Sequence, residues 1–330
     1  MTISFLSNSI NDMPGCTWST TAGTFDSAYV AGSGRIVSNY GGSRPCTFGH
    51  NVDLSGESIV SFHFDYYAPT TSSSLSDGEW MRWTTSNGTL KMYMDYSNGL
   101  LGMRVYDGAG GQTSSSFTYL FPVNTLVTVD LVYEDDGVNV TGTMYVNEVS
   151  VLSVTRAASG AAVMPQVALV THTDIYNSGG NAHYSQLIFA HGETTVGMKM
   201  ERLDADSIGA HTDMSSTITE INDDDRGTGW SSGTNTDKNS YNLPTYTVPT
   251  GRLIHSLNAQ STVRIGTTGP VNIRPFVRIS SVDYDSAADW TPPQHQFGKH
   301  NASWTVDPAT TVAWTAAGIS AAEVGFQVKT

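Results

Sequence analysis

The stretch that decides the fold runs from His183 to Arg202 and reads HYSQLIFAHGETTVGMKMER. Its aromatic and aliphatic side chains mark two short extended runs, one over Tyr184–Ala190 and one over Thr195–Arg202. Between the runs lies a polar break with a glycine, His191–Thr194. We expect Tyr184–Ala190 to be the last strand of a first domain. Thr195–Arg202 then carries the chain into a second, different domain.

The chain before this stretch reads as short strands. Ser58–Tyr66 alternates apolar and polar side chains, the period of a strand buried on one face, and it places His63 on the face away from the core. A histidine there is expected to face solvent or bond a neighbour rather than bind a ligand. Asn87-Gly88 and Asn98-Gly99 are strong hairpin signals. Further strands are predicted over Trp80–Thr84, Leu90–Tyr96, Leu100–Tyr106, Thr125–Tyr133, Val138–Val146, Val149–Val154 and Val163–Thr171.

The chain after this stretch changes character from Asp204 onward. It is polar and rich in Gly and Asp at first, and it then contains strand patterns over Arg252–Ile265, Asn272–Val282 and Val324–Val328. Ala309–Ala322 is expected to hold one short helical turn. A chain of 330 residues suits two domains. The sequence therefore predicts an all-β protein: a jelly-roll sandwich over residues 1–195 and a smaller β-sandwich over residues 196–330, a candidate assembly or docking domain.

Composition excludes several classes of function. The net charge is −14 and basic residues are not clustered, so we expect no nucleic-acid partner. No apolar run approaches the roughly 20 residues of a membrane span, so membrane insertion is not expected. Met1–Ile10 lacks the basic start of a signal peptide, which predicts a protein made and used without Sec export. Cys16 and Cys46 are either two free thiols or a disulfide.

One acidic cluster is a candidate metal site. Asp223, Asp224 and Asp225 stand beside Gly227 in a predicted loop, and carboxylate oxygens are ligands that Ca²⁺ prefers. The cluster lacks the spaced pattern of an EF-hand, and ion pairing with Arg226 is the alternative. No other cofactor is indicated.

Three aromatic residues are candidate glycan contacts. Trp80, Trp83 and Tyr93 fall within one predicted meander. Trp80 and Trp83 lie on opposite faces if their strand is regular, so one indole would be core and the other would be open to a sugar ring. Burial of the aromatic side chains in the core is the alternative.

Paired carboxylates are the signature of glycoside hydrolases. The pattern Glu-x-Asp-x-x-Glu is absent, and carboxylates two apart occur at Asp77 and Glu79, Glu134 and Asp136, and Asp283 and Asp285. Each pair is predicted in a turn or at a strand end, where solvation explains it. We therefore predict no catalytic residue and no enzymatic activity.

Two sets of segments carry a family resemblance. Leu126–Tyr133, Thr143–Asn147 (TMYVN) and Tyr184–Ala190 together resemble laminin-G-like or concanavalin A-like jelly rolls. Tyr184–Ala190, Thr195–Met200 (TVGMKM), Asp223–Trp230 (DDDRGTGW) and Trp304–Phe326 resemble structural proteins of tailed bacteriophages.

The resemblance implies a non-enzymatic virion component at the tail tip, in a fibre or on the capsid surface. Such a protein would assemble in the host cytoplasm with copies of itself or with other virion proteins. Contact between its lectin-like half and host surface glycans is a further expectation. The alternatives are a stand-alone carbohydrate-binding module and a polysaccharide depolymerase, which needs two carboxylates about 5–10 Å apart in a groove.

Overall fold

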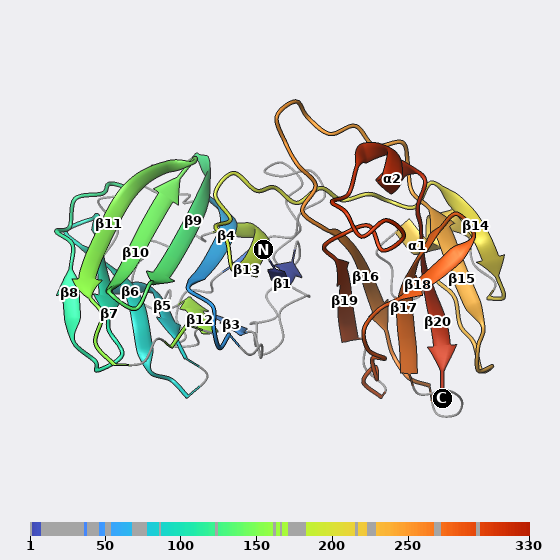
Figure 1. Ribbon diagram of the computed structural model, residues 1–330, viewed down its shortest axis with the longest axis horizontal. Helices are drawn as coiled ribbons and strands as arrows, with labels where there is room; N and C mark the ends of the chain where they lie inside the picture. Colours follow the sequence, from blue (N-terminus) through green and yellow to red (C-terminus); the bar gives the residue numbers. More distant parts are fainter. Residues whose placement is uncertain are drawn as a thin grey trace. The chain divides into compact units, whose positions relative to one another are not determined.

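The computed structural model shows an all-β chain in two compact units, residues 1–200 and 201–330 (Figure 1). The predicted domain boundary lies between residues 195 and 196. No helix in the described part of the chain is long and apolar enough to cross a membrane. The structure describes residues 2–7, 36–37, 46–49, 54–67, 78–85, 87–122, 125–160, 163–165, 167–170, 183–214, 217–222, 229–266, 272–294 and 298–330.

The described strands of the first unit form two antiparallel sheets. One has the order β1-β13-β4-β9-β10-β11, with β2 also paired to β13, and the other has the order β3-β12-β5-β6-β7-β8. The strands are β1 (Thr2–Ser7), β2 (Ile36–Val37), β3 (Cys46–Gly49), β4 (Ile59–Tyr67), β5 (Gly78–Thr84), β6 (Leu90–Ser97), β7 (Leu100–Tyr106), β8 (Gln112–Ser114), β9 (Leu126–Asp135), β10 (Asn139–Val146), β11 (Val149–Ala157), β12 (Val167–Val170) and β13 (His183–His191).

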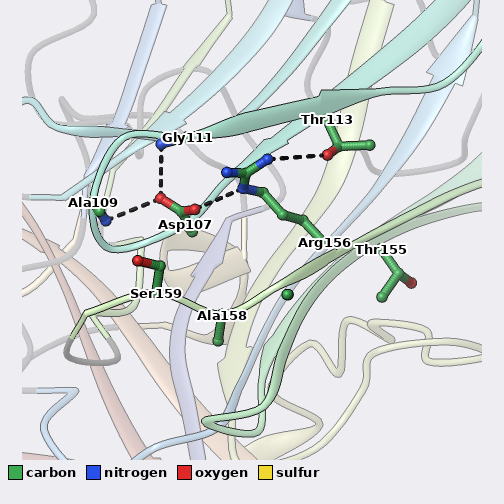
Figure 2. A pocket seen from close by; sticks show the side chains of 9 residues that line it. Asp107, Ala109, Gly111, Thr113, Thr155, Arg156, Ala158 and Ser159 are labelled. Carbon is green, nitrogen blue, oxygen red and sulfur yellow. Dashed lines mark hydrogen bonds and ion pairs between the residues drawn. The ribbon is translucent and has the colours of Figure 1, made fainter.

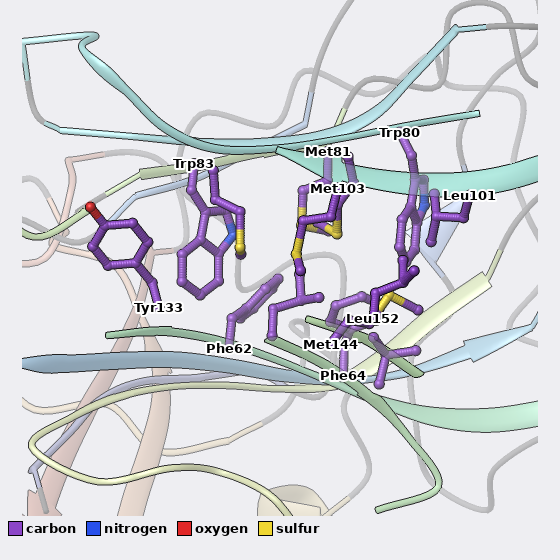
Figure 3. Close-up of a cluster of buried hydrophobic side chains, with 14 of the residues drawn as sticks. Phe62, Phe64, Trp80, Met81, Trp83, Leu101, Met103, Tyr133, Met144 and Leu152 are labelled. Carbon is purple, nitrogen blue, oxygen red and sulfur yellow. The ribbon is translucent and has the colours of Figure 1, made fainter. Parts of the chain in front are cut away.

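An aromatic layer between the two sheets forms the core of the first unit (Figure 3). Phe62 and Phe64 point inward from β4 because they alternate with polar residues along the strand. They meet Trp83 and Trp80 of β5, with ring centroids 6.2 and 6.0 Å apart respectively. All four side chains are fully buried. Burial of each such ring contributes about 2–3 kcal/mol to folding.

The hairpin after β6 follows the predicted turn chemistry. Asn98 and Gly99 have φ values of 51° and 76°, the left-handed conformation that a two-residue hairpin turn requires. They join β6 to β7 in register, with Ser97 opposite Leu100. The predicted Asn-Gly hairpin is confirmed here.

The exit from β13 differs from the prediction of a second extended run. Thr195–Arg202 contains no strand, and Met198 N–H donates to the Thr195 carbonyl at 2.9 Å to form a turn. Gly197 has a φ of 79°, a conformation that glycine adopts without strain.

A buried polar cluster anchors this exit segment to the outer face of the sheet. Thr195 Oγ1 donates to Asp130 Oδ1 at 2.8 Å, and His63 Nδ1 lies 2.8 Å from the same oxygen. All three side chains are buried. His63 therefore bonds a neighbour on the face away from the core, as predicted. The exit segment covers it from solvent.

The second unit contains a five-stranded antiparallel sheet, β14-β15-β20-β17-β18, and the pair β16-β19. The helical turn predicted within Ala309–Ala322 is α2, and its N-cap Thr315 accepts from Gly318 N–H. The elements are β14 (Ser207–Thr212), α1 (Ile218–Asn222), β15 (Lys238–Asn242), β16 (Leu257–Val263), β17 (Asn272–Ile279), β18 (Val282–Asp285), β19 (Gly298–Trp304), α2 (Ala316–Ser320) and β20 (Glu323–Lys329).

The strand patterns missed β14, β15, β18 and β19. The interior strand β15 is polar yet buried, because Asn239 Nδ2 donates to the Met214 carbonyl at 2.7 Å and its Oδ1 accepts from Met214 N–H at 2.8 Å. A buried amide with both hydrogen bonds made costs little, so a polar sequence can occupy the middle of a sheet.

Gly325 of β20 is required by close packing. A Cβ at this position would lie 2.2 Å from Cζ of Phe276 and 2.6 Å from the backbone oxygen of Asn239. Phe276 is fully buried, and the backbone oxygen cannot move without breaking the sheet. Gly325 thus lets the ring of Phe276 lie across β20.

We predict that Gly325→Ala lowers the free energy of unfolding by about 1–3 kcal/mol, because the added methyl overpacks the sheet. Gly233→Ala is the matched control, since a Cβ there would meet nothing within 4 Å. The control should stay within about 0.5 kcal/mol of the parent chain. Urea denaturation of the full chain measures both, and equal stability of the two variants would contradict the packing argument.

Candidate functional site

A cleft of about 670 Å³ opens at the rim of the first unit (Figure 2). It lies where the β7–β8 hairpin meets the end of β11. Its lining is mostly small and polar: Asp107, Ala109, Gly111, Thr113, Thr155, Arg156, Ala157, Ala158 and Ser159.

Asp107 organises the hairpin side of the cleft. Its Oδ1 accepts from the N–H groups of Ala109 and Gly111 at 3.0 and 2.7 Å, which folds the loop after β7 around the carboxylate. Its Oδ2 accepts from Arg156 Nε at 2.6 Å. The hydrogen bond from Arg156 lowers the pKa of Asp107 most, and the two backbone N–H groups add to it while burial opposes it. Asp107 is therefore ionised and fully bonded.

Arg156 is held in place but is still accessible. Its Nη1 donates to the Gln112 carbonyl at 3.0 Å and lies 3.4 Å from Thr113 Oγ1, and about a third of the side chain (32%) is exposed. Nη2 has no hydrogen-bond partner among the described residues. A Cβ added to Gly111 would lie only 2.0 Å from Nη2, so the guanidinium tip packs directly against this glycine. The cleft thus offers a fixed guanidinium edge together with the hydroxyl side chains of Thr113 and Ser159. The hydroxyl of Thr155 is bonded to Thr141 at 3.0 Å on the other face of β11.

Two buried titratable groups lie within electrostatic range of Asp107. Lys91 is 1% exposed, and burial lowers its pKa while the carboxylates of Asp135 and Asp107 oppose that shift. Burial chiefly raises the pKa of Tyr133, whose hydroxyl lies 3.3 Å from the carbonyl of Tyr106. Neither group lines the cleft.

Sequence reasoning did not find this site. The Asp-Gly-Ala-Gly-Gly run from Asp107 is a recognisable turn signal. Arg156 lies 49 positions further along the chain, and nothing local to it indicates its partner.

Trp80 and Trp83 do not lie on opposite faces, so that prediction is wrong. The ladder between β5 and β6 has irregularities at Glu79/Met81 and at Trp83/Thr84, and these change which way the side chains point. Both indoles are fully buried and point toward Phe62 and Phe64 (Figure 3). They present no face to a sugar, so the alternative of an aromatic core describes them.

Tyr93, the third candidate glycan contact, is partly exposed on the outer face of β6. The guanidinium carbon of Arg104 lies 5.3 Å from its ring centroid, a cation–π contact. Burial raises the pKa of the Tyr93 hydroxyl, and the charges of Glu79 and Asp95 add to the shift.

The acidic residues singled out in the sequence lie partly outside and partly within the described part of the chain. Asp223, Asp224, Asp225 and Asp77 lie outside the described residues, and no cluster of three metal-ligating side chains is found within them. The expectation that the carboxylate pairs lie in turns or at strand ends holds for Asp136, in the turn after β9. It does not hold for Asp283, which lies within β18.

Asp283 is the centre of a charged cluster on the second unit. Lys238 Nζ donates to its Oδ2 at 2.6 Å, Arg278 Nη1 donates to its Oδ1 at 2.7 Å, and His211 Nε2 lies 2.9 Å from Oδ2. Burial opposes ionisation, but these hydrogen bonds outweigh it and lower the pKa of Asp283 to about 2. Since His211 belongs to one edge strand and Asp283 to the other, this contact ties the two edges of the sheet together.

No protein-family model matches the chain, and no curated protein matches it. Solved structures similar to it include the botulinum neurotoxin type G receptor binding domain, with 9% identity and a TM-score of 0.36 over 52% of this chain and 40% of that one. Another is HCR/D-Sa-GBL1/C, with 9% identity and a TM-score of 0.36 over 76% and 64%. A third is botulinum neurotoxin type C, with 12% identity and a TM-score of 0.31 over 52% and 45%.

Cell entry of the type C toxin is dependent upon interaction with two ganglioside molecules. The chain spans about two fifths of the length of the type G domain that it matches.

We predict that Asp283→Asn lowers the free energy of unfolding by about 2 kcal/mol at pH 7, the equivalent of the pKa shift. A depressed carboxyl pKa stabilises the fold above the unfolded value of 3.8, and this contribution is lost as pH falls toward about 2. The gap between variant and parent should therefore close between about pH 4 and pH 2.

Denaturation series at several pH values measure this gap. Asp285→Asn, on the same strand and 39% exposed, is the control and should change stability by less than about 1 kcal/mol. A constant gap across the pH range would mean that the carboxylate charge of Asp283 does not stabilise the sheet.

Proposed function

We propose that the protein is a non-enzymatic component of a tailed-phage virion and that its first unit binds glycans at the Asp107–Arg156 cleft. In this proposal the first unit is a concanavalin A-like jelly roll, and the second is a smaller β-sandwich that docks onto other virion proteins or onto further copies of the chain. The observation that carries the binding role is the guanidinium of Arg156, fixed by Asp107 in an open, hydroxyl-lined cleft.

The chemistry of the cleft suits a polyhydroxylated ligand. A guanidinium that is already held by a carboxylate loses little conformational entropy when it donates to a ligand oxygen. The hydroxyls of Thr113 and Ser159 both donate and accept, as sugar hydroxyls do. The small side chains of Ala157 and Ala158 leave room for a sugar ring.

The same geometry favours binding over hydrolysis. A glycosidase needs two carboxylates flanking the bond that it breaks, and the residues lining the cleft include one, Asp107. That carboxylate is bonded on both oxygens and has a lowered pKa, so it is a poor proton donor near neutral pH. These points support a binding module rather than a depolymerase.

The virion role is supported by the resemblance of Thr195–Met200 and Trp304–Phe326 to tailed-phage structural proteins. In this role the protein assembles in the host cytoplasm, and the cleft contacts glycans of the host surface.

We predict that Gly111→Ala and Arg156→Ala each weaken glycan binding at least tenfold. The methyl group of the first variant displaces the guanidinium tip, and the second variant removes the guanidinium. A glycan array that includes bacterial surface polysaccharides, followed by titration of the best ligand, measures the effect. Arg274→Ala, which removes an arginine paired with Asp285 and Asp289 on the second unit, should bind normally. If both cleft variants bind the glycan as tightly as the parent chain, the glycan site does not lie in this cleft.

We predict that a chain ending at Gly197 folds as the first unit but does not join the particle, because the docking unit is missing. This cut keeps Thr195 and its hydrogen bond to the buried Asp130. Circular dichroism and urea denaturation check the fold, and immunoblots of particles from a complemented deletion phage check incorporation. Incorporation of the truncated chain at the full-length level would rule out the second unit as the docking unit.

A further inference from the structure

The outer face of β5, β6 and β7 carries two rows of side chains that face away from the aromatic core. One row contains Arg82, Tyr93 and Arg104, and the other contains Glu79, Asp95 and Gly102, each in cross-strand register. We call this surface the Arg–Tyr–Arg face. Adjacent strands lie about 4.8 Å apart, so one small ligand can contact all three strands.

Each arginine of this face is held by one carboxylate. Arg82 donates Nε and Nη2 to the two oxygens of Glu79 at 2.5 and 2.7 Å, and 43% of its side chain is exposed. Arg104 donates Nη2 to Asp95 Oδ2 at 2.7 Å, and 34% of its side chain is exposed. The contact of Arg104 with the Tyr93 ring fixes it further.

Both arginines keep unused donors. Arg82 Nη1, Arg104 Nε and Arg104 Nη1 have no hydrogen-bond partner within the described residues. Both side chains are partly exposed, so an anion can bind them without breaking the existing ion pairs. A guanidinium that is already oriented suits a carboxylate in particular, because the two planar groups match.

Asp95, which holds Arg104, lies beneath the exposed surface of this face. The residue is 8% exposed, and its Oδ1 is buried without a hydrogen-bond partner. Leaving such an acceptor unpaired costs about 1–3 kcal/mol, and native proteins rarely do so. This oxygen is not accessible at the surface, so the polar contacts with a ligand on this face are made by the free donors of Arg82 and Arg104.

Phe117 completes the face with an apolar wall. A Cβ on Gly102 would lie 2.8 Å from Cδ1 of Phe117, so the phenyl ring covers the glycine next to Asp95. Phe117 and Tyr93 are both partly exposed. Their rings offer apolar surface to the C–H groups of a sugar.

We propose that the Arg–Tyr–Arg face binds a carboxylate-bearing saccharide of the uronic acid class. The carboxylate accepts from Arg82 or Arg104, and the sugar ring packs against Phe117 and Tyr93. This site is separate from the Asp107–Arg156 cleft and does not depend on the function proposed for it.

Isothermal titration of the full chain with trigalacturonic acid tests the proposal, with maltotriose as the uncharged control. The parent chain should bind the acid at least tenfold more tightly than maltotriose. Arg104→Gln and Arg82→Gln should each weaken binding of the acid about tenfold or more, since each removes charged donors. Arg104→Lys keeps the charge and should recover part of the loss. Arg274→Ala, on the second unit and in neither site, should bind the acid as the parent chain does.

Several results would overturn the proposal. No binding of trigalacturonic acid by the parent chain, or equal binding of maltotriose, removes the assignment to acidic sugars. Unchanged binding by both glutamine variants removes the face as the site. If only Arg156→Ala loses binding of trigalacturonic acid, the acid binds in the Asp107–Arg156 cleft and not on the Arg–Tyr–Arg face. Because Arg82 is the more exposed arginine, its variant still tests the face if Arg104→Gln fails to fold.

Discussion

The inward burial of both Trp80 and Trp83 is the constraint on which the first unit depends. A regular strand would bury one indole and expose the other, and the irregular pairing of β5 with β6 sends both into the layer with Phe62 and Phe64. Because the large apolar side chains of β5 point into the core, the outer face of this strand carries Glu79 and Arg82. The same bulges that complete the core thus create the polar face.

The fold was predictable where local pattern and tertiary environment agree. The strand β4 alternates strictly, and Asn98-Gly99 requires a hairpin whatever surrounds it. Prediction failed where a distant partner decides the outcome. The bulge at Trp80 turns its side chain to the opposite face of the strand, and no feature of the composition signals it. Asn239 lies in a buried strand only because the backbone of Met214 makes hydrogen bonds with its side-chain amide. Asp107 and Arg156 are also far apart in the sequence, so neither composition nor residue spacing predicts the cleft that they form.

One arrangement recurs in the polar sites of both units: an arginine held at one edge by a carboxylate. It occurs at Asp107 and Arg156 in the cleft, at Asp95 and Arg104 on the sheet face, and at Asp283 and Arg278 in the second unit. In a chain with 30 acidic and 16 basic residues, carboxylates are abundant enough to hold each of these guanidinium groups. Hydrogen bonds lower the pKa of Asp107 and Asp283, which keeps these two carboxylates ionised and unsuited to proton transfer, whereas burial raises the pKa of Asp95. In all three pairs the carboxylate orients its arginine as a donor. The chemistry therefore favours recognition over catalysis.

The anchoring of Thr195 on Asp130 has a mechanical consequence. The chain leaves the first unit from β13, a strand hydrogen-bonded to β4 on one side and to β1 on the other. Tension on the chain beyond Met200 first loads the Thr195–Asp130 hydrogen bond and reaches β13 only when that bond breaks. Because β13 is held by backbone hydrogen bonds on both sides, two ladders must then open before the strand leaves the sheet.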